Sequence, residues 1–251
     1  MNLVPSAFKK IADGSKTIEL RLNDKKRQRI AEGDTIVFSQ IGNGDIAVAS
    51  VKKLHRFSNF AELYEALPLE KCGYGVAEIN TAHYSDMEQF YSKEDIAKYG
   101  ALGIELDGVY SICGVKDKLF RDDILPLLAP SVYNPTSERL QARAEKYSSD
   151  PDIRVCAYKE YEYKGIVAFS MEDNIATILD IAVSSDFRGQ GIGSRLVNYI
   201  KDKINPEKNI AETDDDAVLF YKKYGFEATP IKTDYDSNRY SCILEVNSKS
   251  N

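Results

Sequence analysis

The sequence predicts an α+β protein of two domains, and three observations lead to this prediction. In the first part, short strand-like runs alternate with glycine turns, as in a small β-barrel with attached helices. In the second part, longer apolar runs precede a glycine-rich turn and an amphipathic helix, as in a mixed α/β sheet. The length of 251 residues suits one large domain or two small ones. We expect the domains at residues 1–110 and 118–251, with Gly108 and Gly114 breaking the pattern between them.

The elements of the first domain follow from helix and turn signals. Ser58 can cap a helix that Pro68 ends, because a serine hydroxyl accepts from a free backbone N–H at a helix start. Alternating apolar residues between glycine turns indicate strands. The expected elements are helices over residues 5–13, 58–67 and within 86–98, and strands over residues 17–22, 35–39, 46–54 and 101–106.

In the second domain we expect helices over residues 119–128 and 136–147, with Thr136 as a cap, and strands over residues 153–159, 165–171 and 176–183. A further helix follows the glycine-rich turn. Its apolar face comprises Ile192, Leu196, Val197, Ile200 and Ile204. Thr213 and Asp216 have the spacing of a capping box, so we interpret the acidic run at residues 214–216 as structural and not as a metal site. We expect the polar tail after Val246 to be frayed.

Composition narrows the class of protein. The chain has 43% hydrophobic and 29% charged residues, no apolar run long enough to span a membrane and no signal-like stretch, so a cytoplasmic protein is expected. Four scattered cysteines and two histidines predict no metal site. The net charge of −6 argues against broad nucleic-acid binding. A basic cluster nevertheless lies within residues 16–29, either as a solvated face or as a local patch.

The stretch at residues 188–193 reads Arg-Gly-Gln-Gly-Ile-Gly and lies between an apolar strand and a helix. Glycines allow a ligand to approach the backbone, and the free N–H groups of a helix start attract anions. Arg188 can add a charge-assisted contact. The spacing matches neither a dinucleotide-binding fingerprint nor a Walker motif. About thirty residues on, residues 217–226 carry a second motif, Ala-x-x-Phe-Tyr-x-x-x-Gly-Phe.

These two motifs, in this order, resemble the GNAT superfamily of acetyltransferases from about Lys118 to the C-terminus. The resemblance implies a mixed α/β sheet, acetyl-CoA as co-substrate and an amine acceptor. It implies that the strand at residues 181–183 meets the pantetheine arm and that the glycine loop holds the pyrophosphate. The implied cofactor-binding residues are Ile181, Ala182, Val183, Arg188, Gly189, Gln190, Gly191, Ile192, Gly193 and Ser194.

The resemblance also implies catalytic roles. Tyr221 is where the family often has its general acid, which protonates the CoA thiolate, although a tyrosine there can also simply pack in the core. The glutamate that many members carry on the central strand is replaced by Thr177 and Ile178. Asp180 and Glu212 are the remaining candidates for the general base, and each can equally be a strand-end residue that pairs with a lysine.

The first part resembles an ASCH domain, a relative of the PUA-like barrels, over roughly residues 1–108. Residues 14–21 read Gly-x-Lys-Thr-Ile-Glu-x-Arg, and residues 33–38 read Gly-Asp-x-Ile-x-Phe. The resemblance implies a cleft that binds RNA or a modified nucleoside. Lys16, Glu19 and Arg21 would line it, or they form only a surface ion network. Some small family members hydrolyse acetylated cytidine with a threonine where this chain has Glu19, which weighs against hydrolysis.

The leading hypothesis is an acetyl-CoA-dependent N-acetyltransferase whose first domain binds RNA or a nucleotide-like ligand. One alternative is a non-catalytic module that senses CoA and binds RNA. Another is an amidohydrolase of acetylated nucleosides in the first domain. The acceptor class stays open between protein amines, polyamines, aminoglycosides and nucleobases. No membrane partner is expected.

Overall fold

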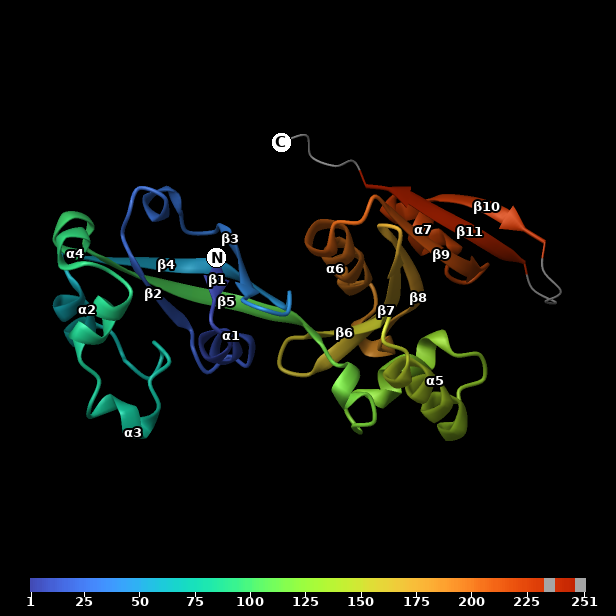
Figure 1. Ribbon diagram of the computed structural model, residues 1–251, viewed down its shortest axis with the longest axis horizontal. Coiled ribbons are helices and arrows are strands. Elements are labelled where there is room, and N and C mark those ends of the chain that lie inside the picture. The colour runs from blue at the N-terminus through green and yellow to red at the C-terminus, as the bar shows by residue number, and fades with distance from the viewer. Residues whose placement is uncertain (233–237, 247–251) are drawn as a thin grey trace. The chain divides into compact units, whose positions relative to one another are not determined.

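The structure is a computed structural model that describes residues 1–232 and 238–246 (Figure 1). The tail after Val246, which was expected to be frayed, lies outside the described residues. The chain divides into two units, Met1–Ser111 and Ile112–Asn251. Each unit combines a sheet with helices, which confirms the predicted α+β class.

The first unit is built on a five-stranded sheet with the order β1-β3-β4-β5-β2. Its strands are β1 (Asn2–Leu3), β2 (Ile18–Leu22), β3 (Thr35–Gln40), β4 (Ile46–Phe57) and β5 (Ala101–Gly114). β1 runs parallel to β3, whereas β3 is antiparallel to β4, and β2 to β5. The sheet curls enough for Arg21 of β2 to donate a hydrogen bond across to the carbonyl of Asn2 in β1, at 3.4 Å.

The helices of the first unit are short. They are α1 (Pro5–Ala12), α2 (Phe60–Ala66), α3 (Val76–Ile79) and α4 (Lys93–Tyr99), with 3₁₀ turns at Arg27–Arg29 and Tyr84–Gln89. The prediction that Ser58 caps this helix is wrong. The cap is Asn59, whose side chain accepts a hydrogen bond from the Glu62 N–H at 3.0 Å at the start of α2. The single helix expected within residues 86–98 is divided into two elements, the 3₁₀ turn Tyr84–Gln89 and α4. The division occurs because the Ser92 side chain accepts from the Asp95 N–H and so starts a new helix.

Strand β2 connects the core of the first unit to its polar surface. Ile18, Leu20 and Leu22 pack with Phe60 and Leu63 of α2 in one hydrophobic cluster. Because side chains alternate along a strand, Glu19 and Arg21 project to the opposite face. The core therefore fixes the position of the two charged side chains that the sequence motif singles out.

The second unit contains a six-stranded sheet with the order β6-β7-β8-β9-β11-β10. Its strands are β6 (Ile153–Lys159), β7 (Tyr163–Glu172), β8 (Ile175–Val183), β9 (Lys208–Asp214), β10 (Glu227–Ile231) and β11 (Arg239–Glu245). β8 and β9 are parallel, and the other neighbours are antiparallel. The three strands predicted between residues 153 and 183 are confirmed.

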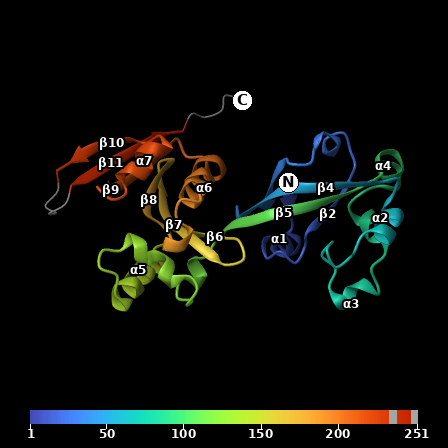
Figure 2. The ribbon, with the colours of Figure 1, turned by 180° about the vertical axis from the view of Figure 1, so that it is seen from behind.

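Helices cover both faces of this sheet. Figures 1 and 2 show α5 (Ser137–Ser149) on one side of β7 and β8 and α6 (Ile192–Tyr199) on the other. A 3₁₀ turn, Ser185–Phe187, precedes α6, a π-helical turn, Ile200–Ile204, continues it, and α7 (Val218–Tyr224) follows β9. Thr136 caps α5 through the Arg139 N–H, as predicted.

Two predictions for this unit are wrong. The helix expected over residues 119–128 is replaced by 3₁₀ segments, Lys116–Lys118 and Leu125–Ser131, because Pro126 lacks the N–H that an α-helix needs. Thr213 does not cap α7 but lies buried in β9. No side chain of the described residues caps α7, whose first flanking residue is Ala217. Asp214 closes the turn before the helix, where its Oδ1 accepts from the N–H groups of Asp216 and Ala217 at 3.1 and 3.3 Å.

Candidate functional site

Strands β8 and β9 part midway along the sheet of the second unit. Their parallel ladder begins at the pair Ile175–Lys208 and ends at Ile178–Ala211, while β8 continues to Val183. The register between β7 and β8 shifts there, so that Leu179 is an extra residue of β8. Such a β-bulge bends the strand that carries it. The β8 edge beyond Ile178, which includes the predicted residues 181–183, therefore offers backbone groups to an extended ligand.

The loop after β8 leads into an open helix start. Gly189 and Gly191 have φ angles of 78° and 77°, which glycine adopts readily. The first intrahelical bond joins the Arg195 N–H to the Gly191 carbonyl, and no side chain caps α6. The N–H groups of Ile192, Gly193 and Ser194 therefore lack intrahelical acceptors and face the approach to the helix. This geometry suits an anion such as a pyrophosphate.

The remaining predicted loop residues surround this start. Arg188 is exposed and its Nε donates to the carbonyl of Val183 at 3.3 Å, while Gln190 contacts the Asp186 carbonyl at 3.5 Å. A Cβ on Gly193 would lie 3.0 Å from the Phe220 ring, so α6 and α7 approach closely here. The structure thus places all ten predicted cofactor-binding residues on the segment that runs from the end of β8 into α6.

Tyr221 lies in α7 and is buried. Its ring packs edge-to-face against Phe220 and Phe226, each with a centroid distance of 5.2 Å. Its hydroxyl makes no hydrogen bond to any residue in the described part of the chain. Burial raises the pKa of Tyr221, and nearby Cys242, Asp180 and Asp214 raise it further. The phenol is therefore neutral at pH 7, as a proton donor must be.

Asp180 is buried on β8 and held by α5. Arg143 Nη1 donates to both carboxylate oxygens, at 3.1 and 2.9 Å, and the Tyr147 hydroxyl donates to Oδ2. Burial raises the pKa of Asp180, although the Tyr147 hydrogen bond and the Arg143 charge act in the opposite direction. Asp180 lies opposite Ala168 of β7, a member of the same core cluster as Tyr147, so its side chain faces α5.

Glu212 differs from Asp180 in its surroundings. It is exposed on β9, opposite Ser241 of β11, and forms no ion pair with the described residues. The charge of Asp180 contributes to the raised pKa of Tyr221. Of the three predicted catalytic residues, Asp180 and Tyr221 are buried, whereas Glu212 is exposed.

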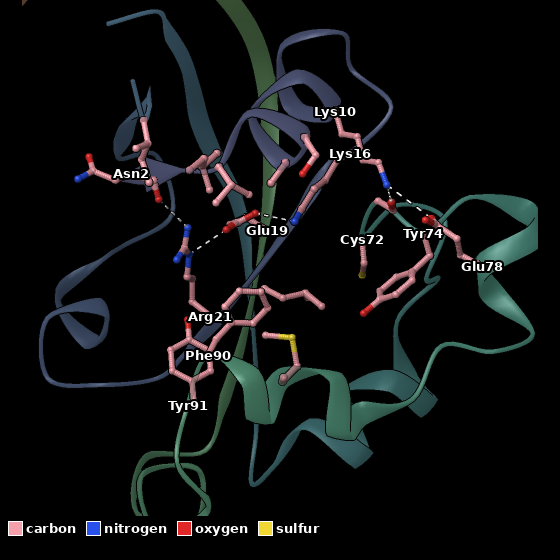
Figure 3. Close-up of a pocket in the computed structure, with 18 of the residues that line it drawn as sticks. Asn2, Lys10, Lys16, Glu19, Arg21, Cys72, Tyr74, Glu78, Phe90 and Tyr91 are labelled. Atoms are coloured by element: carbon pink, nitrogen blue, oxygen red, sulfur yellow. Dashed lines mark hydrogen bonds and ion pairs between the residues drawn. The ribbon is translucent and has the colours of Figure 1, made fainter. Parts of the chain in front are cut away.

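The first unit contains a cavity of about 540 Å³ lined by all three residues predicted for its cleft (Figure 3). Glu19 is only 3% exposed and lies between two cations. Its Oε2 is 2.8 Å from Lys16 Nζ, and its Oε1 is 2.8 Å from Arg21 Nε. Lys16, Glu19 and Arg21 thus form a largely buried ionic cluster and not the exposed network that was the alternative.

The ion pairs in this cluster are close but poorly aligned. Glu19 Oε2 and Arg21 Nε are buried, and neither makes a well-directed hydrogen bond to the described residues. A buried polar atom without a directed partner is costly, so this cluster stabilises the fold less than its short ion-pair distances alone would suggest. Because residue 19 is a glutamate, it offers no hydroxyl that could act as the nucleophile of a hydrolase. The nearby Cys72 thiol is protonated at neutral pH, because burial raises its pKa to about 11.

Sequence reasoning missed the opposite wall of the cavity. This wall comes from the segment between α2 and α4 and carries Tyr74, Met87, Phe90 and Tyr91. Lys10 closes one side through a 2.5 Å hydrogen bond to the carbonyl of Gly73 (Figure 3). The helix expected within residues 86–98 gave no sign that its residues face Glu19, and the density of aromatic residues in the segment was the one available signal.

Neither a metal centre nor a membrane-spanning helix occurs among the described residues. In residues 1–232 and 238–246, no His, Cys, Asp and Glu side chains gather closely enough to hold a metal ion. Within the same residues, no helix has both the length and the apolar character needed to cross a bilayer.

Comparison with protein families identifies both parts of the chain. Residues 1–109 match the model of the ASCH domain, and residues 151–228 match that of the acetyltransferase (GNAT) domain. No curated protein matches the chain.

Solved structures show weaker likeness. The ribosomal-protein-S18-alanine N-acetyltransferase of Escherichia coli is 16% identical, with 56% of this chain and 96% of that chain covered and a TM-score of 0.43. An aminoglycoside 6′-N-acetyltransferase complexed with coenzyme A is 17% identical, with 56% and 99% covered and a TM-score of 0.44. A hypothetical protein is 31% identical, with 43% and 94% covered and a TM-score of 0.35. With TM-scores of this size, the two domain assignments rest on the family models.

Proposed function

Because the chain joins an ASCH domain to a GNAT acetyltransferase domain, we propose that it transfers the acetyl group of acetyl-CoA to an amine. The observation that carries this proposal is the parting of β8 and β9 directly before an uncapped helix start. An extended pantetheine arm can pair with the free edge of β8, as an added strand does. The diphosphate then meets the N–H groups at the start of α6.

The proposed chemistry needs two proton transfers. The acceptor amine loses a proton, its nitrogen attacks the thioester carbon, and the tetrahedral intermediate collapses with release of the CoA thiolate. We assign the amine proton to Asp180, which Arg143 and Tyr147 orient. We assign protonation of the thiolate to Tyr221, whose neutral phenol lies within the electrostatic influence of Asp180. The backbone of β8 near the bulge would donate to the oxyanion.

For the ASCH domain we propose a ligand that contains a nucleobase, either a nucleoside or an RNA base. The cavity volume is in the range of small-ligand sites. Phe90 is 62% exposed at the cavity and offers a face on which a base can stack. Glu19 can accept from an exocyclic amine, and Lys16 or Arg21 can donate to a ring nitrogen or a carbonyl.

A release assay for free thiol tests the transferase proposal. Acetyl-CoA is offered with a panel of protein amines, polyamines, aminoglycosides and RNA. We expect the protein to release thiol with one class of amine. Gly191→Ala should abolish this release, because the added Cβ would occupy the space in front of the helix start. Gly44→Ala is the matched control, since Gly44 has a similar φ of 80° and equally open surroundings, but lies in the ASCH domain. Equal activity of all three proteins would refute the proposal.

A second candidate is a module that senses CoA without chemistry. The observation that favours it is the engagement of Asp180 by Arg143 and Tyr147, which leaves the only buried candidate base of β8 inside an ion pair. In that case the protein binds CoA, but acetyl-CoA is not consumed with any amine of the panel.

A further inference from the structure

A second cavity adjoins the first in the ASCH domain. Its volume is about 560 Å³, close to that of the first. The two cavities share Asn2, Arg21 and Arg27 as lining residues, so these side chains form the wall between them. A ligand that fills the first cavity can therefore extend past this wall into the second.

The wall between the cavities is cationic. Arg21 directs Nε toward Glu19 at 2.8 Å and Nη2 toward the Asn2 carbonyl at 3.4 Å. A guanidinium has donors on several edges, so Arg21 can contact groups on both sides. Arg27 is oriented by Asp24, which accepts from its backbone N–H at 2.9 Å and pairs with its guanidinium. This local fold holds the Arg27 side chain at the boundary.

The second cavity also has a cation without an ion pair. Lys26 lines it, is exposed and pairs with no carboxylate among the residues that the structure describes. The carboxylate of Asp34 lines it as well, but it accepts from the Ala31 N–H at 2.9 Å. The segment over residues 24–29 carries four cations and one carboxylate, in a chain whose net charge is −6. Such a local reversal of charge favours an anionic ligand group.

We propose that the second cavity is a phosphate subsite, so that the ASCH domain binds a nucleotide unit and not a bare nucleoside. This inference rests on the proposed nucleobase ligand of the first cavity. The base lies against the aromatic wall and Glu19, and the phosphate lies beyond Arg21, where Lys26 and Arg27 reach it. Arginine and lysine are the side chains that bind phosphate through charge-assisted hydrogen bonds. The phosphate belongs to a free nucleotide or to an RNA strand.

Titration calorimetry of the full chain tests the subsite. The probes are the four ribonucleosides, their 5′- and 3′-monophosphates and short single-stranded RNA, all at one salt concentration. We expect the phosphate to raise affinity about tenfold, the effect of one charge-assisted hydrogen bond. Lys26→Ala should remove most of this gain and leave nucleoside affinity unchanged. Tighter binding of RNA than of either monophosphate identifies a strand as the source, and the reverse identifies a free nucleotide.

Lys25→Ala is the matched control, because Lys25 is the exposed neighbour of Lys26 and lines neither cavity. If both variants lose the affinity that the phosphate adds to the same extent, the effect is one of diffuse charge, and the proposal of a phosphate subsite is overturned. Nucleoside binding without any gain from phosphate would also overturn it, while the proposed base site stands. Failure of every nucleoside and nucleotide to bind would remove the base site as well. Lys26→Gln and thermal melting check that folding is intact.

Discussion

At the scale of single residues, the charge of Arg143 favours the ionised form of Asp180, the proposed general base. The base must be ionised to accept a proton, and burial already raises the pKa of Asp180. Arg143→Ala removes a positive charge that favours the ionised form, so the pKa rises further. We expect the acid limb of kcat/KM to move to higher pH in Arg143→Ala, and to move less in Arg143→Lys, which keeps the charge.

Asp180→Asn provides the reference for that measurement. Loss of a general base lowers the rate by about 10²-fold or more. The variant should also lose the acid limb altogether, because the group that titrates there is gone. An unchanged pH profile in Asp180→Asn would assign the limb, and the base, to another residue such as Glu212.

Tyr221 provides a second test at this scale. Tyr221→Phe keeps the ring that packs between Phe220 and Phe226 and removes only the hydroxyl, which has no partner to lose among the described residues. We expect stability to change by less than about 1 kcal/mol and kcat to fall by about 10²-fold. An unchanged kcat would mean that Tyr221 only packs. A loss of stability with no loss of rate per folded molecule would lead to the same conclusion.

Gly73 tests the ASCH cavity. It has a φ of 97°, and an added Cβ would lie 2.9 Å from Lys16 Cδ. Gly73→Ala should displace the Lys16 side chain and weaken nucleoside binding, in addition to a backbone cost of about 1 kcal/mol. Gly42→Ala is the control, since Gly42 has a φ of 106° and nothing within 4 Å of the added atom. Calorimetry should show normal nucleoside affinity in Gly42→Ala only.

At the scale of elements, the approach of α6 to α7 links the glycine loop to Tyr221. In Gly193→Ala the new methyl group would press on the Phe220 ring, and Phe220 packs against Tyr221. Overpacking costs about 1–3 kcal/mol, which exceeds the gain of up to about 1 kcal/mol from better helix propensity. We expect a lower melting temperature and weaker CoA binding.

The double variant Gly193→Ala/Phe220→Leu is the control for that prediction. The smaller leucine relieves the contact, so stability should partly return. If the double variant is less stable than either single variant, the close approach of α6 and α7 is not the cause.

The elements that the sequence predicts well have local causes. The Thr136 cap starts α5, alternating apolar residues form β6 to β8, and glycines form the loop before α6, all of which depend on near neighbours in the chain. The wrong predictions have competing local causes. Pro126 removes a helix, and the side chain of Asp214, not that of Thr213, closes the turn that leads into α7.

Features that depend on partners far along the chain could not be predicted. The bulge at Leu179 is defined only by its register against β7, and the ionic neighbours of Asp180 come from α5. Tyr74 and Phe90 line the same cavity as Glu19 only because α2 packs on the core face of β2 and the chain then returns along the cavity. The charged residues of both candidate sites are therefore readable from the sequence, whereas the groups that orient them are not.

At the scale of the whole molecule, the two units have separate cores and separate candidate sites. The ASCH cavity is lined only by residues from 2 to 91. The segment proposed to bind CoA, over residues 181–194, and the proposed catalytic residues Asp180 and Tyr221 lie in the second unit. β5 alone crosses the boundary, since it begins at Ala101 in the first unit and ends at Gly114 in the second. Each ligand should therefore stabilise its own unit.

Hydrogen exchange followed by mass spectrometry tests this independence. Some local openings of the protein can occur only after the ligand has left. A ligand at 100 times its Kd makes such openings about 100-fold rarer. We expect acetyl-CoA to slow exchange in β8 and α6, and a nucleoside to slow it in β2 and in the segment over residues 72–91. Gly191→Ala should remove only the first effect and Lys16→Ala only the second. Slower exchange in both units with a single ligand would contradict independence, and β5 would then be the first element to test as the coupling path, because its backbone belongs to both units.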